Sequence, residues 1–315
     1  MKYIVTGGAG FIGSHIVEAI AGSHEVVVID NLSSGKLENL SGFSTNVHHI
    51  PGSITDLPLL REAFSGADGI FHLGAIASVA KSVDDPAATH ATNLTGTVNV
   101  LLAARDCGVK KVVFSSSSAV YGDEPTLPKR EDMLPVPLSP YAVSKLAGEY
   151  YCKVFFELYG LETVSLRYFN IFGPRQDPRS EYAAVIPKFI TRLLNHQAPL
   201  IFGDGKQTRD FVYVRDVVQA NLLAMQSTRT GIFNIGSGES LDLNTLARTL
   251  STIMEVNIPP VYEKPRSGDI RDSVSDVTLA KKILGYRTSY SLDKGLAETV
   301  TWFRQRRAEM NNQAK

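Results

Sequence analysis

Two side chains that could transfer a proton, Tyr141 and Lys145, lie four residues apart in the segment SPYAVSK (139–145). Because Pro140 suits the first turn of a helix, this spacing predicts that both side chains lie on one helix face. A free phenol, with a pKa of about 10, is protonated near neutral pH, and a nearby ammonium group favours its ionised form. The pair therefore fits general acid/base catalysis. A packing tyrosine beside a surface lysine is the alternative.

Four consecutive serines follow the short apolar run Val112–Phe114, in the segment SSSSAVYG (115–122). Open parallel sheets bind ligands at the carboxyl ends of their strands, so hydroxyl groups collected there can contact a substrate. One of them could hydrogen-bond the reacting oxygen while Tyr141 exchanges its proton. A polar turn without chemistry is the alternative.

Three glycines, Gly7, Gly10 and Gly13, lie in the segment TGGAGFIG (6–13), between a predicted strand and a predicted helix. A Cβ atom at these positions would obstruct the tight turn, keep a pyrophosphate off the backbone, and separate the helix from the strand. The helix N-terminus offers free N–H groups to phosphates. Asp30 ends the second predicted strand, where a carboxylate can accept hydrogen bonds from both ribose hydroxyls. This combination predicts a dinucleotide site.

The residues around Asp30 favour NAD over NADP as the cofactor. The carboxylate would repel a 2′-phosphate, and the following segment NLSSG (31–35) contains no arginine. Lys36 is the one nearby cation in the sequence, and it fits a solvated loop charge about as well as a phosphate contact.

Apolar runs alternate with amphipathic stretches in the first half of the chain, which is typical of βαβ units. The predicted strands are 3–6, 26–30, 69–73, 112–115 and 163–166, and the predicted helices are 12–21, 58–64, 87–107 and 141–159. Beyond about residue 168, loops bearing proline and glycine separate helices at 185–195, 214–225 and 292–309. We therefore expect an α/β fold with a Rossmann-type doubly wound parallel sheet. Residues 1–167 would form the NAD-binding domain, with a later segment at about 207–235 returning to it, and residues 168–315 a smaller, mainly substrate-binding region.

Charge and composition exclude several classes of protein. The 315 residues include 32 basic and 32 acidic side chains, so no net field attracts nucleic acid or an anionic membrane, and we expect neither as a partner. The two cysteines, Cys107 and Cys152, fit no metal-ligand spacing, so no metal site is expected. The first residues lack the apolar run of a signal sequence, and no run of about 18 apolar residues occurs. We expect a cytoplasmic protein.

Together these motifs resemble the extended short-chain dehydrogenase/reductase superfamily, and within it the NAD-dependent UDP-hexose 4-epimerases. The similarity covers essentially the whole chain. It includes the further segments HLGA (72–75), NLTGT (93–97), RYFN (167–170), FGPR (172–175), RDFVYV (209–214) and NIGSG (234–238). The resemblance implies bound NAD, a UDP-sugar substrate, and a homodimer formed through the helices at 87–107 and 141–159.

The resemblance also implies roles for individual residues. The catalytic residues would be Ser117, Tyr141 and Lys145. The substrate would be held by Ser117, Tyr141, Asn170, the uracil-holding residues Leu200 and Phe202, the diphosphate-clamping Arg209 and Arg266, and Asp269 and Ser273. The cofactor would be contacted by Gly7, Gly10, Phe11, Ile12, Gly13, Asp30, Asn31, Ser33, Ser34, Gly35, Ser53, Ile54, Leu73, Gly74, Ala75, Asn93, Ser115, Tyr141, Lys145 and Tyr168.

Two positions depart from the pattern of the family, and a third bears on the choice of sugar. Ser53 stands where many relatives carry an aspartate that touches adenine, and Ala77 where some carry a lysine directed at the cofactor. Relatives restricted to simple hexoses carry a bulky residue seven positions after the clamp arginine, and relatives that accept N-acetylhexosamines carry a small one. Ser273 occupies this position. We therefore expect UDP-GlcNAc and UDP-GalNAc to be accepted as well as UDP-glucose and UDP-galactose.

The implied reaction inverts C4 of the sugar through a transient 4-keto sugar, while NAD stays tightly bound. A UDP-glucuronate decarboxylase is one alternative, and it would want an extra cation for the C6 carboxylate. An NDP-sugar 4,6-dehydratase is another, and it would need an acidic pair where this chain has Ser118 and Ala119. The alternative from a different class is a non-catalytic NAD-binding regulatory protein, although such proteins typically lose the tyrosine or lysine that are both present here.

Overall fold

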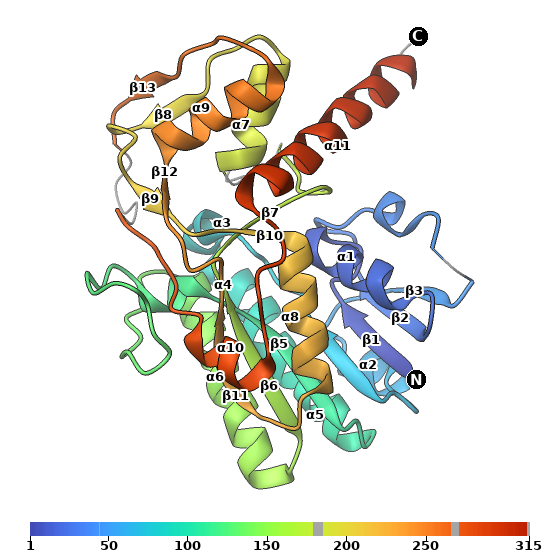
Figure 1. The fold of residues 1–315 in the computed structure, drawn as a ribbon. Helices are drawn as coiled ribbons and strands as arrows, with labels where there is room; N and C mark the ends of the chain where they lie inside the picture. The colour runs from blue at the N-terminus through green and yellow to red at the C-terminus, as the bar shows by residue number, and fades with distance from the viewer. Residues whose placement is uncertain (44, 179–184, 266–270, 314–315) are drawn as a thin grey trace.

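The computed structural model describes residues 1–43, 45–178, 185–265 and 271–313. In this part of the chain, seven parallel strands form one sheet in the order β11-β6-β5-β4-β1-β2-β3 (Figure 1). The strands are β1 (Lys2–Thr6), β2 (Glu25–Asp30), β3 (Val47–Pro51), β4 (Gly69–His72), β5 (Lys111–Ser117), β6 (Glu162–Tyr168) and β11 (Gly231–Ile235). The order reverses direction between β1 and β4, so their carboxyl ends open a crevice of the kind that binds ligands in open α/β sheets.

Helices cover both faces of this sheet, because its strands are apolar on both sides. One core lies between the sheet and helices α1 (Phe11–Ile20), α8 (Val214–Gln226) and α10 (Thr278–Leu284). The other lies between the sheet and helices α2 (Leu57–Ala63), α5 (Gly96–Asp106) and α6 (Pro140–Tyr159). The predicted Rossmann-type doubly wound sheet is confirmed.

A third core lies outside the sheet and packs α7 (Val185–Leu194), α9 (Leu243–Met254) and α11 (Leu292–Gln313) together. Short strand pairs accompany these helices: β7 (Asn170–Phe172) with β10 (Phe211–Tyr213), β8 (Leu200–Phe202) with β13 (Val261–Glu263), and β9 (Thr208–Arg209) with β12 (Leu241–Asp242). Figure 1 shows α7, α9, β8 and β13 gathered beyond one edge of the sheet, while α8 and β11 return to it. The division of the chain at residue 167 into two domains stays a prediction.

Three short elements lie between β4 and α5, and two 3-10 helices, η1 (Leu37–Leu40) and η3 (Ser118–Tyr121), follow β2 and β5. Helix α3 (Val79–Asp84) and the short helix α4 (Pro86–Thr89) precede a π-helical turn, η2 (His90–Thr95). The single helix predicted at 87–107 is therefore wrong in detail, since α4, the π turn and α5 follow one another there. Neither β3 nor β11 is among the five predicted strands. The β3 residues VHHIP are half-buried or exposed, and two of them are histidines, so they lack the pattern of a buried strand.

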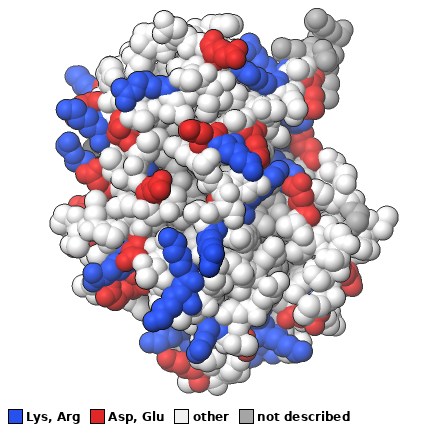
Figure 2. All heavy atoms as spheres, viewed as in Figure 1, with Lys and Arg blue, Asp and Glu red and all other residues white. Residues whose placement is uncertain are grey.

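Charged side chains of both signs are interspersed on the face of the molecule shown in Figure 2. Among the described residues, no helix combines the length and the apolar character required to cross a bilayer.

Candidate active site

The glycine loop after β1 is as tight as the sequence predicts. Gly7 has a φ of +70°, in the left-handed region that favours glycine. A Cβ on Gly13 would lie 2.2 Å from the carbonyl oxygen of Gly7, and a Cβ on Gly7 would lie 2.8 Å from the amide of Gly74. Helix α1 begins at Phe11 without a side-chain cap, so its first N–H groups face the crevice unpaired by a capping residue. This cradle fits a pyrophosphate, as a dinucleotide cofactor requires.

Asp30 is buried at the end of β2 and connects two loops. Its Oδ2 accepts a hydrogen bond from the amide of Ala9 at 3.0 Å, and its Oδ1 accepts one from the amide of Leu32 at 2.8 Å. Gly35 packs against the same carboxylate, since a Cβ there would lie 2.9 Å from Oδ2. The carboxylate therefore holds the glycine loop against the segment 31–35 and has lone pairs left for ribose hydroxyls.

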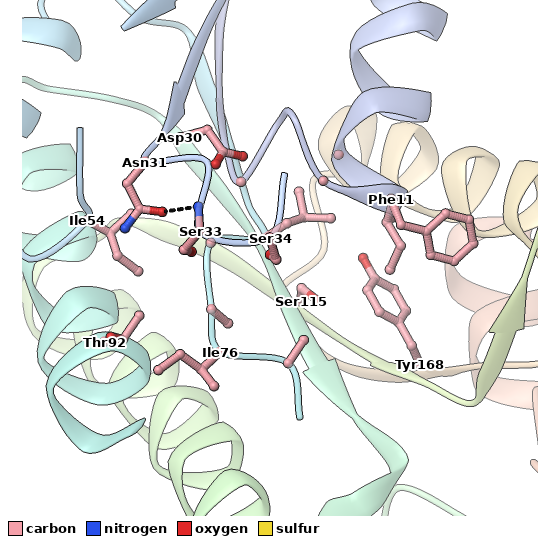
Figure 3. Close-up of a pocket in the computed structure, with 18 of the residues that line it drawn as sticks. Phe11, Asp30, Asn31, Ser33, Ser34, Ile54, Ile76, Thr92, Ser115 and Tyr168 are labelled. Atoms are coloured by element: carbon pink, nitrogen blue, oxygen red, sulfur yellow. Dashed lines mark hydrogen bonds between the residues drawn. The ribbon is translucent and has the colours of Figure 1, made fainter. Parts of the chain in front are cut away.

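A cavity of about 600 Å³ opens at the carboxyl ends of the strands, and its labelled lining is shown in Figure 3. Asn31 accepts a hydrogen bond from the amide of Ser33 within it. The predicted cofactor residues that line it are Gly7, Gly10, Phe11, Ile12, Gly13, Asp30, Asn31, Ser33, Ser34, Ser53, Ile54, Leu73, Gly74, Ala75, Ser115, Tyr141, Lys145 and Tyr168. The remaining two cofactor residues, Gly35 and Asn93, are placed behind this lining.

Asn93 is buried in the π turn and supports a lining residue. Its side-chain oxygen accepts from the amide of Ile76 at 2.7 Å, and its nitrogen donates to the carbonyl of Ile76 at 3.1 Å. The nitrogen also donates to the hydroxyl of Ser144 on α6. Asn93 thus fixes the loop after β4 instead of facing the cavity itself.

His72 holds the start of the same loop. Its ring nitrogens contact the hydroxyls of Thr6 at 2.7 Å and Thr97 at 2.9 Å. Burial lowers the pKa of His72 to about 3, with the charge of Lys145 acting in the same direction. The ring is therefore neutral at physiological pH, and its role is to join β1, β4 and α5.

Several lining residues were missed by the sequence prediction. Lys36 and Asp177 both line the cavity, and they form an ion pair of 3.6 Å between the loops after β2 and β7. Arg175, with a φ of +67°, lies beside them and donates to Glu18 on α1 at 2.6 Å. The only sequence signals were the noted cation at position 36 and the segment FGPRQDP (172–178).

Helix α6 positions Tyr141 and Lys145. Ser139 caps its N-terminus by accepting from the amide of Ala142, and Pro140 occupies its first turn. The Nζ of Lys145 donates to the carbonyl of Ser115 at 2.7 Å and lies 5.8 Å from the centre of the Tyr141 ring. The predicted face shared by these two side chains is confirmed.

Burial acts on the pKa of both groups. It lowers the pKa of Lys145 to about 8. It also raises the pKa of Tyr141, and a hydrogen bond with Ser117 opposes that rise. The lowered pKa that the sequence predicts for Tyr141 therefore needs an additional positive charge in the cavity next to the phenol.

A second cavity of about 440 Å³ adjoins the first and shares Ser117, Tyr141, Tyr168 and Phe169 with it. Its lining adds three predicted substrate residues, Asn170, Arg209 and Ser273. Leu200 and Phe202 line neither cavity: they lie on β8, which pairs with β13 beyond the sheet. Arg266 and Asp269 lie outside the described residues.

The buried carboxylate of Asp210 holds two walls of this second cavity together. Its Oδ1 accepts from the amide and hydroxyl of Ser237 at 2.7 and 2.6 Å. Its Oδ2 accepts from the amide and hydroxyl of Ser275 at 2.9 and 2.5 Å. Because Asp210 follows Arg209 and Ser275 lies two residues after Ser273, one carboxylate sets the positions of both lining residues.

Among the described residues, no cluster of three His, Cys, Asp or Glu side chains is close enough to hold a metal ion. Ser117, Tyr141 and Lys145 all line the first cavity, where they offer acid/base chemistry beside a dinucleotide.

The comparisons with known proteins agree with this geometry. The NAD dependent epimerase/dehydratase family matches residues 3–236. A UDP-glucose 4-epimerase of Mycolicibacterium smegmatis is 41% identical over 313 residues, which cover 97% of this chain and 99% of the relative. A UDP-N-acetyl-alpha-D-glucosaminuronate decarboxylase of Bacillus cytotoxicus is 38% identical over 318 residues, with 96% of this chain and 98% of the relative covered.

A solved structure is similar over almost its whole length. The UDP-N-acetylglucosamine 4-epimerase of Methanobrevibacter ruminantium, in complex with UDP-N-acetylmuramic acid, superposes with a TM-score of 0.95 at 43% identity, covering 97% of this chain and 98% of that one. The predicted resemblance is confirmed by the family match together with the epimerase relatives, and the predicted cofactor, NAD, is confirmed by the family match. The chain belongs to the NAD dependent epimerase/dehydratase family.

Proposed function

We propose that this protein is a UDP-sugar 4-epimerase. The observation that carries the proposal is the junction of the two cavities, where Ser117 and Tyr141 line both. A dinucleotide in the first cavity and a sugar in the second would meet at the acid/base group. The epimerase relatives support this assignment.

Bound NAD supplies a hydride acceptor for C4 of the sugar and a positive ring that favours the Tyr141 phenolate. Tyr141 receives the proton of the 4-hydroxyl, and Ser117 hydrogen-bonds the same oxygen. Lys145 maintains a positive charge near the phenol. Arg209, together with Arg266, would hold the diphosphate while the 4-keto sugar turns over and presents its other face. Return of the hydride to that face, with Tyr141 giving the proton back to the oxygen, would invert C4 without net oxidation.

The range of sugars is proposed to include N-acetylated hexoses. Ser273 lines the second cavity, and its small side chain leaves space where a bulky residue would exclude an acetamido group. The similarity to a UDP-N-acetylglucosamine 4-epimerase supports this extension.

A decarboxylase acting on a UDP-uronate is the second candidate, and one observation favours it. Lys129 lines the second cavity, where its Nζ donates to the carbonyl of Glu124, and it is the candidate for the cation that a C6 carboxylate requires. A relative with that activity is 38% identical. The dehydratase alternative has less support, because Ser118 and Ala119, which also line this cavity, are not acidic.

We also propose that the protein is cytoplasmic and forms a homodimer. Helix α6 presents exposed apolar side chains along one side, at Val143, Tyr150, Val154 and Leu158, which are 40 to 69% exposed. These positions recur at helical spacing and lie away from the buried Ser144, Lys145 and Glu149. A second copy that places its own α6 here would cover them, whereas a monomer would leave them in water.

A coupled assay on the purified protein, without added NAD, tests the proposal. UDP-galactose and UDP-GalNAc are offered in parallel and the products are identified. Epimerisation of both sugars is the expected result. Epimerisation of UDP-galactose alone would overturn the N-acetyl assignment, and loss of carbon dioxide from UDP-glucuronate with no epimer from either sugar would favour the decarboxylase.

A further inference from the structure

A buried ion pair lies behind the catalytic serines and is not used by the reaction described above. Arg167 on β6 donates to Glu149 on α6 through two bonds, Nε to Oε1 at 2.8 Å and a terminal nitrogen to Oε2 at 2.7 Å. Both side chains are almost fully buried, with 2% and 0% of their surfaces exposed. Burying two charges is expensive, so an ion pair in this position calls for a reason beyond stability.

Glu149 also accepts a hydrogen bond from the hydroxyl of Ser116 at 2.5 Å. Ser116 and Arg167 are register partners on the neighbouring strands β5 and β6, so their side chains lie on the same face of the sheet, toward α6. Successive residues of a strand point to opposite faces, so Ser115 and Ser117 point away from α6. Ser116 is 2% exposed and also borders the first cavity. The bond from Ser116 to Glu149 therefore fixes the end of β5 to helix α6.

The contacts between α6 and β5 form a short series. Tyr141, Lys145 and Glu149 are spaced by four residues and share one face of α6. They lie along the end of β5: Lys145 donates to the carbonyl of Ser115, Glu149 accepts from Ser116, and Tyr141 lines both cavities together with Ser117. Each contact constrains the sliding of the helix along the strand.

Arg167 also contacts a residue of the second cavity, through the face of its guanidinium group. Its guanidinium lies 4.7 Å from the centre of the Tyr121 ring, and Tyr121 lines the second cavity. The Tyr121 hydroxyl donates to Asn234 at 2.7 Å. Close packing of helix on strand is possible here because Gly148 has no side chain: a Cβ would lie 2.5 Å from the ring of Phe114.

We propose that Glu149 is a positioning residue for the reaction: paired with Arg167, it anchors Ser116 and so holds Ser117 in register with Tyr141. The proposal rests on the proposed function, because it concerns the geometry of the same acid/base group. Its consequence is that a substitution at Glu149, which lines neither cavity, alters catalysis without touching substrate or cofactor.

The first test compares Ser116→Ala with Thr163→Val in the NAD-loaded enzyme. Thr163 on β6 also donates a buried hydrogen bond to α6, to the carbonyl of Cys152 at 2.9 Å, but away from the cavities. Ser116→Ala is expected to lower kcat for UDP-galactose about tenfold, because small displacements of a catalytic group are costly, with KM changed less than about twofold. Thr163→Val is expected to keep the kcat of the natural enzyme, even where it unfolds at a lower temperature.

The second readout is the pH at which the Tyr141 phenol ionises. It is measured from phenolate absorbance, and the absorbance of the Tyr141→Phe counterpart is subtracted from that of each NAD-loaded protein. Ser116→Ala should move this ionisation to higher pH, because it weakens the bond from Ser117 that lowers the pKa of the phenol. Wild-type ionisation and wild-type kcat in Ser116→Ala would overturn the proposal. If no UDP-sugar is epimerised by the natural protein, the proposed function fails, and the ionisation measurement still decides the positioning role.

A pair of double variants separates positioning from folding. Glu149→Leu with Arg167→Met removes the charges and the acceptor for Ser116, whereas Glu149→Gln with Arg167→Met removes the charges and keeps an acceptor. The glutamine variant is expected to recover about tenfold in kcat over the leucine variant. Equal kcat in two folded variants would show that the acceptor for Ser116 does not matter.

Discussion

Lys36 and Asp177, separated by 141 positions in sequence, pair at 3.6 Å and thereby join two loops that line the dinucleotide cavity. Each side chain is about one-third exposed, so the pair is accessible to salt. The contact connects the loop that follows Asp30 to the loop that follows β7.

Breaking this pair should speed the release of NAD. Lys36→Ala and Asp177→Ala are each expected to raise the NAD dissociation rate about two- to fivefold, since exposed ion pairs contribute about 0.2–1 kcal/mol. The rate can be followed by dialysis against a scavenging dehydrogenase. The double variant should release NAD no faster than either single variant. Fully additive effects, or effects that do not weaken at high salt, would contradict the coupling.

Tyr141→Phe should nearly abolish turnover while NAD stays bound, because the phenol oxygen is lost and the ring that lines the cavity is kept. A fall of at least about 10²–10⁴-fold in kcat is expected for a lost general acid/base. Tyr150→Phe on the same helix, whose residue is 56% exposed, is the matched control and should retain activity. Substantial turnover by Tyr141→Phe would remove this residue from the proton transfer.

Burial of the charged Lys145 should lower the free energy of unfolding of the protein at neutral pH. Burial lowers its pKa to about 8 in the folded protein, from 10.5, so the unfolded chain binds more protons between these values and stability rises with pH across them. Below pH 8 the loss of unfolding free energy reaches its full size, which is on the order of 3 kcal/mol before the bond to Ser115 is considered.

Denaturant unfolding of Lys145→Met beside the natural protein measures this effect. The variant should be the more stable of the two near pH 7, and the difference should shrink as the pH rises from 8 toward 10.5. Parallel stability curves across this range would contradict a lowered pKa. The variant is expected to be inactive, so the substitution raises stability and removes activity.

Ser273→Tyr should suppress epimerisation of UDP-GalNAc and leave that of UDP-galactose within about threefold, because a bulky ring fills space that only the acetamido group needs. Relative kcat/KM values on the two sugars test this, with Ser273→Thr as the conservative control. An equal loss on both sugars would show that the side chain at position 273 does not face the acetamido group.

The elements that carry the cofactor site were predictable because local signals coincide there. Glycine spacing, an apolar strand and a terminal carboxylate all occur within the first thirty residues, and the structure places Gly7, Gly13 and Asp30 in the cavity lining. The acid/base group was equally predictable, because a fixed helical spacing brings Tyr141 and Lys145 to one face.

Other features depend on contacts between distant segments, and no local signal reports them. Asn93 belongs to a predicted helix, but a π turn directs its amide to the backbone of Ile76. Leu200 and Phe202 were assigned through resemblance alone, and β8 pairs with β13 instead of lining either cavity. Asp177 acquires its partner only when the chain folds.

The carboxylate of Asp210 closes a long excursion of the chain. It accepts hydrogen bonds from Ser237 and Ser275, so both ends of the polypeptide that carries α9, β12 and β13 are held at one buried group. The same polypeptide also pairs with β8 and β9 and packs α9 against the third core, so its ends and its body are fixed by separate contacts. A single buried carboxylate therefore sets where this outer part of the chain joins the large sheet.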